Sequence, residues 1–361
     1  MDVKRRFLAL GVCGALAVSG ILGTGAVART RPGKPKNPCI DKADDARAFN
    51  LKVDGEKATG RFALPAKQPK ALVVYAHGFG HTSASWVEHM KTSAKEHGVI
   101  AVAMDYRGIE ISPDSNDDGL PESRGWNAMA GAEDLIAAAQ HFDKKCKSIE
   151  EIALLGVSMG GNMSGLAVAL TGANDIKKSS GDPLFDYWFD IEGAVNMTET
   201  YLAARAAGPA NGTAAAAAED IEAETGGPIE SNPAAYQERT VVARMDDIDA
   251  AGLKGTVVVH GVDDGLVPYN QAREMATLLA QAEIPTLLVT IGEKSEETER
   301  DTSASGHVLS NVDPEYRSPL AGHASEKSTT HIVMVTAFDY LWSVLDGNGP
   351  TAYSETIVSG G

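Results

Sequence analysis

The residues with the clearest chemical potential form the stretch Gly156-Val-Ser158-Met-Gly160, in which a serine stands between two glycines. An apolar run, 151–155, precedes this stretch, and an apolar segment of helical composition, 160–170, follows it. A strand, a tight turn and a helix in this order project the serine hydroxyl above the edge of a sheet. A side chain at either glycine would collide with neighbouring backbone. The pattern therefore predicts a nucleophile at Ser158.

A serine hydroxyl is a weak nucleophile at neutral pH, so it needs a base, and the base needs an orienting carboxylate. With this type of turn the chain order is serine, acid, histidine. The apolar run 255–259 leads into Asp263 and Asp264 at the carboxyl edge of a predicted strand, where parallel sheets bind ligands. The alternatives are a glycine-rich turn without chemistry around Ser158 and a solvated turn at the two aspartates.

The elements that must position these residues form an α/β pattern. Apolar runs without alternation, separated by helical stretches, predict a mostly parallel, doubly wound sheet that is covered on both faces. The predicted strands are 71–76, 99–104, 151–155, 191–195, 255–259 and 286–291, and the predicted helices are 85–96, 127–142, 160–170, 269–282 and 331–345. Two alternating segments, 48–53 and 57–64, flank Asp54-Gly55 and predict a β-hairpin ahead of this sheet.

One insertion interrupts the alternation of strands and helices. The segment 197–250 is longer than a crossover helix needs. Its alanine-rich stretches, 203–207 and 214–218, favour helix, whereas Gly226-Gly-Pro228 interrupts it. We expect a small helical cap that arches over the active site, with a flexible surface insertion as the alternative.

The N-terminal residues have the composition of a secretory signal peptide. Lys4-Arg5-Arg6 is a basic region, 7–21 is apolar, and Ala26-Val-Ala28 is an A-x-A cleavage site. The apolar run is too short for a membrane span, and Cys13 lacks a convincing lipobox, so we expect an exported, secreted bacterial protein without a stable membrane anchor. The predicted organisation is a signal peptide at 1–28, a leader at 29–47, an α/β domain at 48–348 and a C-terminal tail at 349–361.

Charge and cysteine content narrow the partners and the compartment. The net charge of −17 argues against nucleic-acid and anionic-membrane partners. Cys39 and Cys146 would remain after signal cleavage, and an even pair of cysteines in an exported chain predicts one disulfide.

The acidic stretch 114–119 has the D-x-N-x-D-G spacing of a calcium loop, with candidate ligands at Asp114, Asn116 and Asp118. Its twelfth position, however, is Gly125 rather than a bidentate glutamate. We prefer an acidic Asx-turn loop and assign no metal, keeping structural calcium as the alternative. Trp126 follows the stretch and is expected to anchor the next helix to the core rather than to stack on a substrate.

Four motifs together resemble the α/β-hydrolase superfamily, particularly the prolyl-oligopeptidase-like and acetyl-esterase-like serine hydrolases. They are His77-Gly-Phe-Gly80, Asp105-Tyr-Arg-Gly108, Gly156-Val-Ser-Met-Gly-Gly161 and the H-G-x-x-D-x-x-V-P run from His260 to Pro268. The resemblance covers roughly residues 48–345. It implies an α/β-hydrolase fold that needs no cofactor.

The resemblance also implies roles for individual residues. The match of the last motif places the acid on Asp264 rather than on Asp263. The first motif is similar to an oxyanion loop, which implies that the backbone N–H groups of Phe79 and Met159 hold the developing oxyanion.

The family usually places the histidine in a loop between the last strand and the last helix. Three histidines lie in this region, His307, His323 and His331. We expect His323 to be the base because Gly322-His323 matches the common Gly-His context and precedes the final helix. His307 remains the alternative, and His331 is better explained by packing at the start of the helix.

We therefore expect a secreted serine hydrolase that cleaves carboxylic esters through an acyl-enzyme. Ser158 would attack the ester, His323 would take and return the proton, and Asp264 would fix the histidine tautomer. One alternative is a serine peptidase of the prolyl-oligopeptidase type that acts on short peptides. The other is a non-catalytic binding protein on the same scaffold.

Overall fold

The structure is a computed structural model that describes residues 37–41, 45–114, 119–262, 264–292 and 322–358. The strands are β1 (Arg47–Val53), β2 (Glu56–Ala63), β3 (Ala71–Ala76), β4 (Ile100–Met104), β5 (Glu110–Ser112), β6 (Glu122–Arg124), β7 (Glu151–Val157), β8 (Tyr187–Ile191), β9 (Gly255–Gly261), β10 (Thr286–Ile291) and β11 (Ser354–Val358). The helices are η1 (Ser83–Trp86), α1 (Val87–Glu96), α2 (Ala128–Lys145), α3 (Met159–Ala173), α4 (Met197–Ala207), α5 (Gly212–Thr225), α6 (Pro233–Glu238), η2 (Val241–Ala243), α7 (Met245–Ala250), α8 (Asn270–Gln281), α10 (Ile332–Ser343) and η4 (Val344–Asn348).

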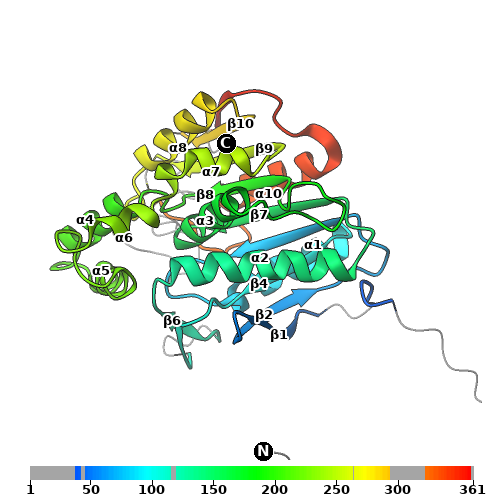
Figure 1. Ribbon diagram of the computed structural model, residues 1–361, viewed down its shortest axis with the longest axis horizontal. Helices are drawn as coiled ribbons and strands as arrows, with labels where there is room; N and C mark the ends of the chain where they lie inside the picture. The colour runs from blue at the N-terminus through cyan, green and yellow to red at the C-terminus, as the bar shows by residue number, and fades with distance from the viewer. Residues whose placement is uncertain (1–36, 42–44, 115–118, 263, 293–321, 359–361) are drawn as a thin grey trace, which may run out of the picture. The chain divides into compact units, whose positions relative to one another are not determined.

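Nine of the strands form one sheet in the order β1-β2-β4-β3-β7-β8-β9-β10-β11. β2 pairs antiparallel with both β1 and β4, and every other neighbouring pair in this sheet is parallel. The apolar side chains of α2, α3 and α8 pack on one face, and those of α1 and α10 pack on the other (Figure 1). Helices on both faces leave the central strands β3, β7 and β9 almost completely buried, which explains why their sequences are apolar without alternation. The predicted fold class is confirmed.

Two predicted boundaries are wrong. The strand predicted at 191–195 lies at Tyr187–Ile191, and it ends there because Glu192 adopts a φ of 48°. Buried Asp190 interrupts the apolar pattern of this strand. A prediction based on hydrophobicity therefore misplaces the strand. The segment 349–361 was predicted as a tail outside the domain, but its part Ser354–Val358 pairs in parallel with β10. This edge strand is largely exposed, so its sequence carries little hydrophobic signal.

The insertion at 197–250 is helical, and its caps explain where its helices begin and end. The side chain of Asn196 accepts a hydrogen bond from the Glu199 N–H at the start of α4. The side chain of Asn211 does the same for α5, which ends where Gly226 adopts a left-handed φ of 78°. These helices are seen beside the sheet in Figure 1.

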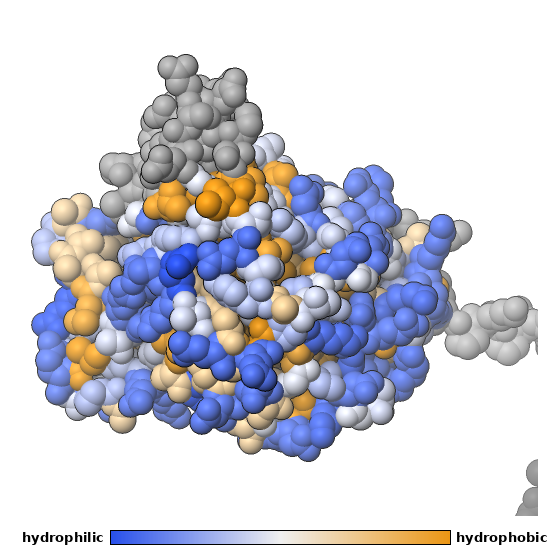
Figure 2. All heavy atoms as spheres, turned by 90° about the horizontal axis from the view of Figure 1, so that it is seen from above, coloured by the Kyte–Doolittle hydropathy of each residue, from blue (hydrophilic) through white to orange (hydrophobic). Residues whose placement is uncertain are grey.

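The surface is largely hydrophilic on the side that Figure 2 shows. Hydrophilic residues predominate on the face shown in Figure 2, between smaller groups of hydrophobic side chains. No helix in the described part of the chain is long and apolar enough to cross a membrane. The predicted signal peptide, residues 1–28, lies outside the described residues.

A disulfide joins Cys39 to Cys146, as predicted. Cys39 precedes β1, and Cys146 is the residue that caps the C-terminus of α2. Both cysteines are buried. The bond therefore fixes the segment ahead of the edge hairpin to a helix that packs on the centre of the sheet.

Removing this disulfide should destabilise the fold. In the chain-entropy model a cross-link across 107 positions contributes about 4–5 kcal/mol. We expect the double variant Cys39→Ser, Cys146→Ser to lose up to that amount of unfolding free energy in urea titrations. The control is the wild type with reductant, which should behave like the double variant. Equal midpoints for oxidised wild type and variant would contradict the prediction.

Candidate active site

Ser158 lies at the turn between β7 and α3, with φ 57° and ψ −122°. Such a conformation is strained for a residue with a side chain. Three hydrogen bonds hold it: the Ser158 N–H donates to the Ile191 carbonyl at 3.0 Å, and the Ser158 carbonyl accepts from the Gly161 and Ala194 N–H groups at 2.9 and 3.0 Å. The backbone around β8 thus fixes the direction in which the serine side chain leaves the turn.

The glycines on either side of the serine are required by close backbone approach. A Cβ at Gly156 would lie less than 3.0 Å from the Gly160 carbonyl, and a Cβ at Gly160 would lie less than 3.0 Å from the Ala76 carbonyl on β3. Real Cβ atoms essentially never approach that closely. The structure therefore agrees with the prediction that a side chain at either glycine would collide with neighbouring backbone.

The structure brings Asp264 and His323 together although they are far apart in the chain. His323 Nδ1 lies 2.7 Å from Asp264 Oδ2 in a buried hydrogen bond. Asp264 Oδ1 accepts the N–H groups of Leu266 and Val267 at 2.8 and 2.9 Å, and this fixes the carboxylate plane. His260 Nε2 lies 3.3 Å from the same Oδ2 atom.

Electrostatics in this buried pair favour an ionised aspartate beside a basic imidazole. Burial alone would raise the pKa of Asp264, but the charges and hydrogen bonds of His323 and His260 hold it well below its usual range. Burial alone would lower the pKa of His323, but the charge and hydrogen bond of Asp264 outweigh it and raise the pKa to about 9. The buried carboxylate therefore stabilises the protonated imidazolium of His323.

The other residues that the sequence offered as the base or the acid are His331, His307 and Asp263. His331 is the N-cap of α10, where its Nδ1 accepts the Val333 N–H at 3.3 Å, so its role is to cap and pack the helix. Its buried position lowers its pKa to about 3. His307 and Asp263 lie outside the described residues.

The segment after β3, residues 77–81, is called the oxyanion segment after the role that the sequence resemblance implies for it. Among the described residues, neither the Phe79 N–H nor the Met159 N–H at the start of α3 has a hydrogen-bond partner. A Cβ at Gly78 would lie 3.4 Å from Ser158 Cβ, so this segment passes directly beside the serine. Phe79 packs on buried Trp126, whose Nε1–H donates to Asn162 on α3 at 3.3 Å. Trp126 therefore anchors the oxyanion segment to α3.

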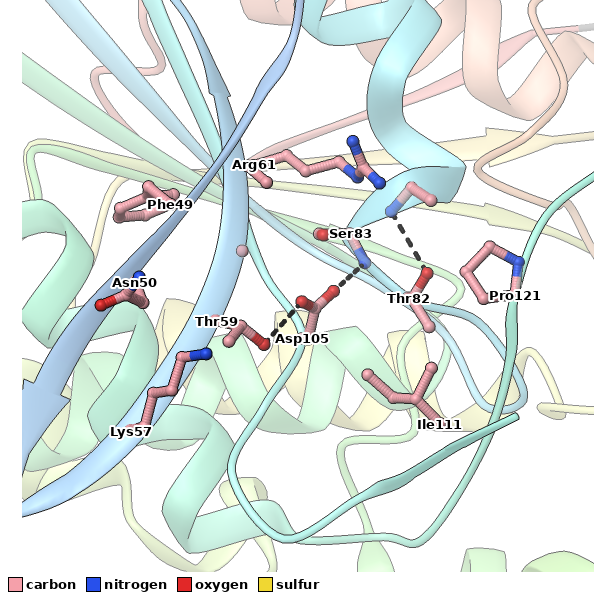
Figure 3. A pocket seen from close by; sticks show the side chains of 13 residues that line it. Phe49, Asn50, Lys57, Thr59, Arg61, Thr82, Ser83, Asp105, Ile111 and Pro121 are labelled. Carbon is pink, nitrogen blue, oxygen red and sulfur yellow. Dashed lines mark hydrogen bonds between the residues drawn. The ribbon is translucent and has the colours of Figure 1, made fainter. Parts of the chain in front are cut away.

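The motif that begins at Asp105 holds the oxyanion segment in place through hydrogen bonds and ring stacking. The Asp105 carboxylate accepts the Thr59 hydroxyl and the Ser83 N–H, both at 2.8 Å, and so ties β2 to the start of η1 (Figure 3). Tyr106 donates its hydroxyl to the His77 carbonyl at 3.0 Å and stacks on the His77 ring. The motif thus positions the segment.

Two buried glutamates beside these residues were missed by the sequence analysis. Glu192 follows β8, and its Oε2 lies 3.6 Å from His323 Nδ1. Glu326 lies three positions after His323; its Oε1 accepts the Gly78 N–H at 2.9 Å and lies 2.8 Å from His81 Nδ1. Burial alone would raise the pKa of Glu326, but its interaction with His81 lowers the pKa to about 2. Neither glutamate belongs to a motif, so no local signal marks them.

Glu192, Asp264 and His323 are also of residue types that bind metal ions. Side-chain atoms of Glu192, Asp264 and His323 lie within 4.8 Å of one another. Backbone N–H groups and the imidazole already occupy the carboxylate oxygens, as in a hydrogen-bonded catalytic pair. Asn116 and Asp118 of the candidate calcium loop lie outside the described residues, and the Asp114 carboxylate accepts the Gly119 N–H at 2.7 Å.

Two cavities lie on either side of Pro121. The first, of about 370 Å³, connects the oxyanion segment to the helical insertion and to the loop 322–331, named here the histidine loop. Its lining includes Phe79, His81, Lys327, Gly212, Thr213 and Ala216. The second, of about 340 Å³, lies between β2 and η1, and Lys57, Arg61, Thr59 and Ile111 are among its lining residues (Figure 3).

A family model confirms what these features suggest. The model described as the alpha/beta hydrolase family matches residues 73–336, which is well over half of the chain and spans Ser158, Asp264 and His323. The chain belongs to the α/β-hydrolase family. No curated protein matches the sequence.

Solved structures with TM-scores above 0.5 show the same fold. A puromycin-hydrolyzing peptidase of Mycobacterium tuberculosis has 18% identity and a TM-score of 0.52, covering 86% of this hydrolase and 41% of the peptidase. An acylaminoacyl peptidase of Pyrococcus horikoshii has 15% identity and a TM-score of 0.52, covering 75% and 39%. An esterase of Pyrobaculum calidifontis has 17% identity and a TM-score of 0.46, covering 68% and 74%. The hydrolase thus spans about two fifths of the length of the two peptidases.

The close approach at Gly160 is testable by adding one methyl group. We expect Gly160→Ala to lower the unfolding free energy by about 1–3 kcal/mol, because the Cβ meets rigid backbone on β3. The matched control is Gly212→Ala at the start of α5, where a Cβ would meet nothing within 4 Å. Urea denaturation of both variants measures the difference. Equal stability of the two variants would show that the backbone of the turn at Ser158 can relax to accept the methyl group.

Proposed function

We propose that this protein is an exported serine hydrolase that cleaves carboxylic esters through an acyl-enzyme. The observation that carries the proposal is the buried 2.7 Å hydrogen bond between His323 Nδ1 and Asp264 Oδ2. It orients an imidazole in a protein whose Ser158 sits in a strained turn beside two backbone N–H groups that have no hydrogen-bond partner in the described part of the chain. Nucleophile, base, orienting acid and oxyanion donors are the parts that acyl transfer requires.

In the proposed reaction the Ser158 oxygen attacks the ester carbonyl carbon while His323 Nε2 takes the hydroxyl proton. The carbonyl electrons move to oxygen, where the N–H groups of Phe79 and Met159 bind the negative charge. The imidazolium, stabilised by Asp264, then gives its proton to the leaving alkoxide. Water repeats the sequence on the acyl-enzyme, releases the acid and restores the serine.

The disulfide between Cys39 and Cys146 supports the proposed export. Disulfides of this kind persist in oxidising compartments outside the cytoplasm. The basic and apolar N-terminal sequence with its A-x-A site points the same way.

A second candidate is hydrolysis of short peptide amides. The two solved structures with TM-scores above 0.5 described above are peptidases by name. Esters and amides pass through the same type of acyl-enzyme, so the two candidates differ in leaving group rather than in machinery. A panel of p-nitrophenyl esters beside prolyl p-nitroanilides separates them by their relative kcat/KM.

The nucleophile assignment is tested by Ser158→Ala. We expect the variant to keep its fold and to lose ester turnover by at least about 10³-fold, because the acyl-enzyme cannot form. A fluorophosphonate probe should label the wild type at Ser158. The matched control is Ser180→Ala, an exposed serine, which should retain full turnover and labelling. Full activity of Ser158→Ala would overturn the mechanism, and a wild type without labelling or turnover would support the non-catalytic alternative.

The helical insertion is expected to set the preferred size of the acyl or alcohol group, because α5 lines the cavity that begins at Phe79. We expect Ala216→Trp to fill part of this cavity and to raise KM for bulky esters more than for acetate esters.

The matched control for this substitution is Ala206→Trp on the exposed side of α4, which should leave the profile unchanged. Rates with p-nitrophenyl esters of increasing chain length measure the effect. An unchanged profile in folded Ala216→Trp would place the substrate elsewhere.

A further inference from the structure

Glu192 contacts the strand that leads to Asp264 and the loop that carries His323, and its neighbours in the chain contact Ser158. It stands at the carboxyl end of β8, between the strands that lead to Ser158 and to Asp264. Its N–H donates to the Val259 carbonyl on β9 at 2.9 Å. The neighbouring Ile191 carbonyl and Ala194 N–H bond to Ser158 itself.

The side chain of Glu192 connects the acid strand to the histidine loop. Its Oε1 accepts the Gly261 N–H at the end of β9 at 3.1 Å. Its Oε2 accepts the Ala324 N–H at 2.5 Å and lies 3.6 Å from His323 Nδ1. The carboxylate is completely buried, so its charge acts on the imidazole with little screening by solvent.

From these contacts we propose that Glu192 is a second positioning carboxylate for His323, acting beside Asp264. The proposal rests on the proposed function, because it assumes that His323 is the base. Glu192 holds the histidine loop through the Ala324 N–H and faces the positive imidazolium that forms when Ser158 loses its proton. The proton stays on His323 until it passes to the leaving group, and Glu192 takes no proton in the reaction.

The charges around the pair set the direction of the expected pH effect. Asp264, His323 and His260 face Glu192, and His323 also interacts with Glu326 and His331. Burial, together with the charge of Asp264, raises the pKa of Glu192 to about 7. The charge of Glu192 is one of the causes that raise the pKa of His323.

Removing the Glu192 charge should therefore lower the pKa of His323. The base must be neutral in the free enzyme, so the acid limb of kcat/KM against pH should move to lower pH in Glu192→Gln. We expect a shift of about 1 pH unit, as for one charge lost beside a buried group. A shift of that size corresponds to about tenfold in imidazolium stability, so kcat at alkaline pH should fall by about tenfold.

Two further variants separate charge from local structure. Glu192→Asp keeps the charge and should restore the acid limb towards the wild-type position even where its rate is reduced. Asp190→Asn is the matched control, because it changes a buried carboxylate two positions before Glu192, on β8, that interacts with His260 rather than with His323. Asp190→Asn should leave the acid limb in place.

A double variant tests whether the two carboxylates share the role. In Asp264→Asn the carboxylate nearest to His323 Nδ1 is Glu192, which can still favour the productive tautomer. We expect Asp264→Asn to retain at least about tenfold more turnover than Asp264→Asn with Glu192→Gln. Equal turnover of single and double variants would overturn the proposal.

The remaining outcomes are also decisive. A loss of rate in Glu192→Gln without a shift of the acid limb would show a structural role only. If Glu192→Gln does not fold, the wild type decides: the His323 ring signals in an NMR pH titration should show a second inflection from Glu192, and a single inflection would overturn the proposal. Full activity of Ser158→Ala would instead defeat the proposed function itself, whatever Glu192 does.

Discussion

The left-handed backbone conformation of Ser158 is the constraint on which the rest of the structure depends. A residue with a side chain at φ 57° is strained, so its surroundings must hold it there. The hydrogen bonds to the backbone on either side of Glu192 and the bare backbones of Gly156 and Gly160 provide this support. They also fix the spacing of β3, β7, β8 and α3, because no Cβ separates these elements at the turn. The burial of the central strands then supplies the stability that offsets the strain.

Burying charged carboxylates at the carboxyl edge of the sheet costs free energy. Nearby backbone N–H groups and imidazoles offset this cost by hydrogen bonding to them. An ionised carboxylate without partners would be expensive in this environment. Asp264 has two backbone N–H donors and two imidazoles, Glu192 has two backbone N–H donors, and Glu326 has the Gly78 N–H and His81. Asp190 has no hydrogen-bond partner among the described residues, and burial raises its pKa to about 7. Around the proposed active site, Asp264, Glu192 and Glu326 therefore all have hydrogen-bond partners for their buried carboxylates.

The sequence predicted those parts of the fold and site whose physical signal is local. The elbow at Ser158 and the apolar strands of the centre depend on neighbouring residues, and they were predicted at or near their observed bounds. The position of β8 was predicted wrongly, because Asp190 interrupts the apolar pattern of this strand. Glu192 and Glu326 could not be found, since each acts through contacts with distant segments: Glu192 accepts from Ala324 across 132 positions, and Glu326 from Gly78 across 248. Such pairings exist only once the sheet order is known.

Glu192 and Glu326 both hold the histidine loop, each by contacts with a different part of the fold. Glu192 ties the residue after His323 to the strand that leads to the acid, whereas Glu326 ties the same loop to the oxyanion segment through Gly78 and His81. The loop is thus fixed to both halves of the proposed site, and the two buried carboxylates help to set the distance between the proposed base and the proposed oxyanion donors. Because each tie is a charge-assisted hydrogen bond shielded from solvent, it is strong and directional. Backbone hydrogen bonds therefore position the proposed nucleophile, and buried charges position the proposed base.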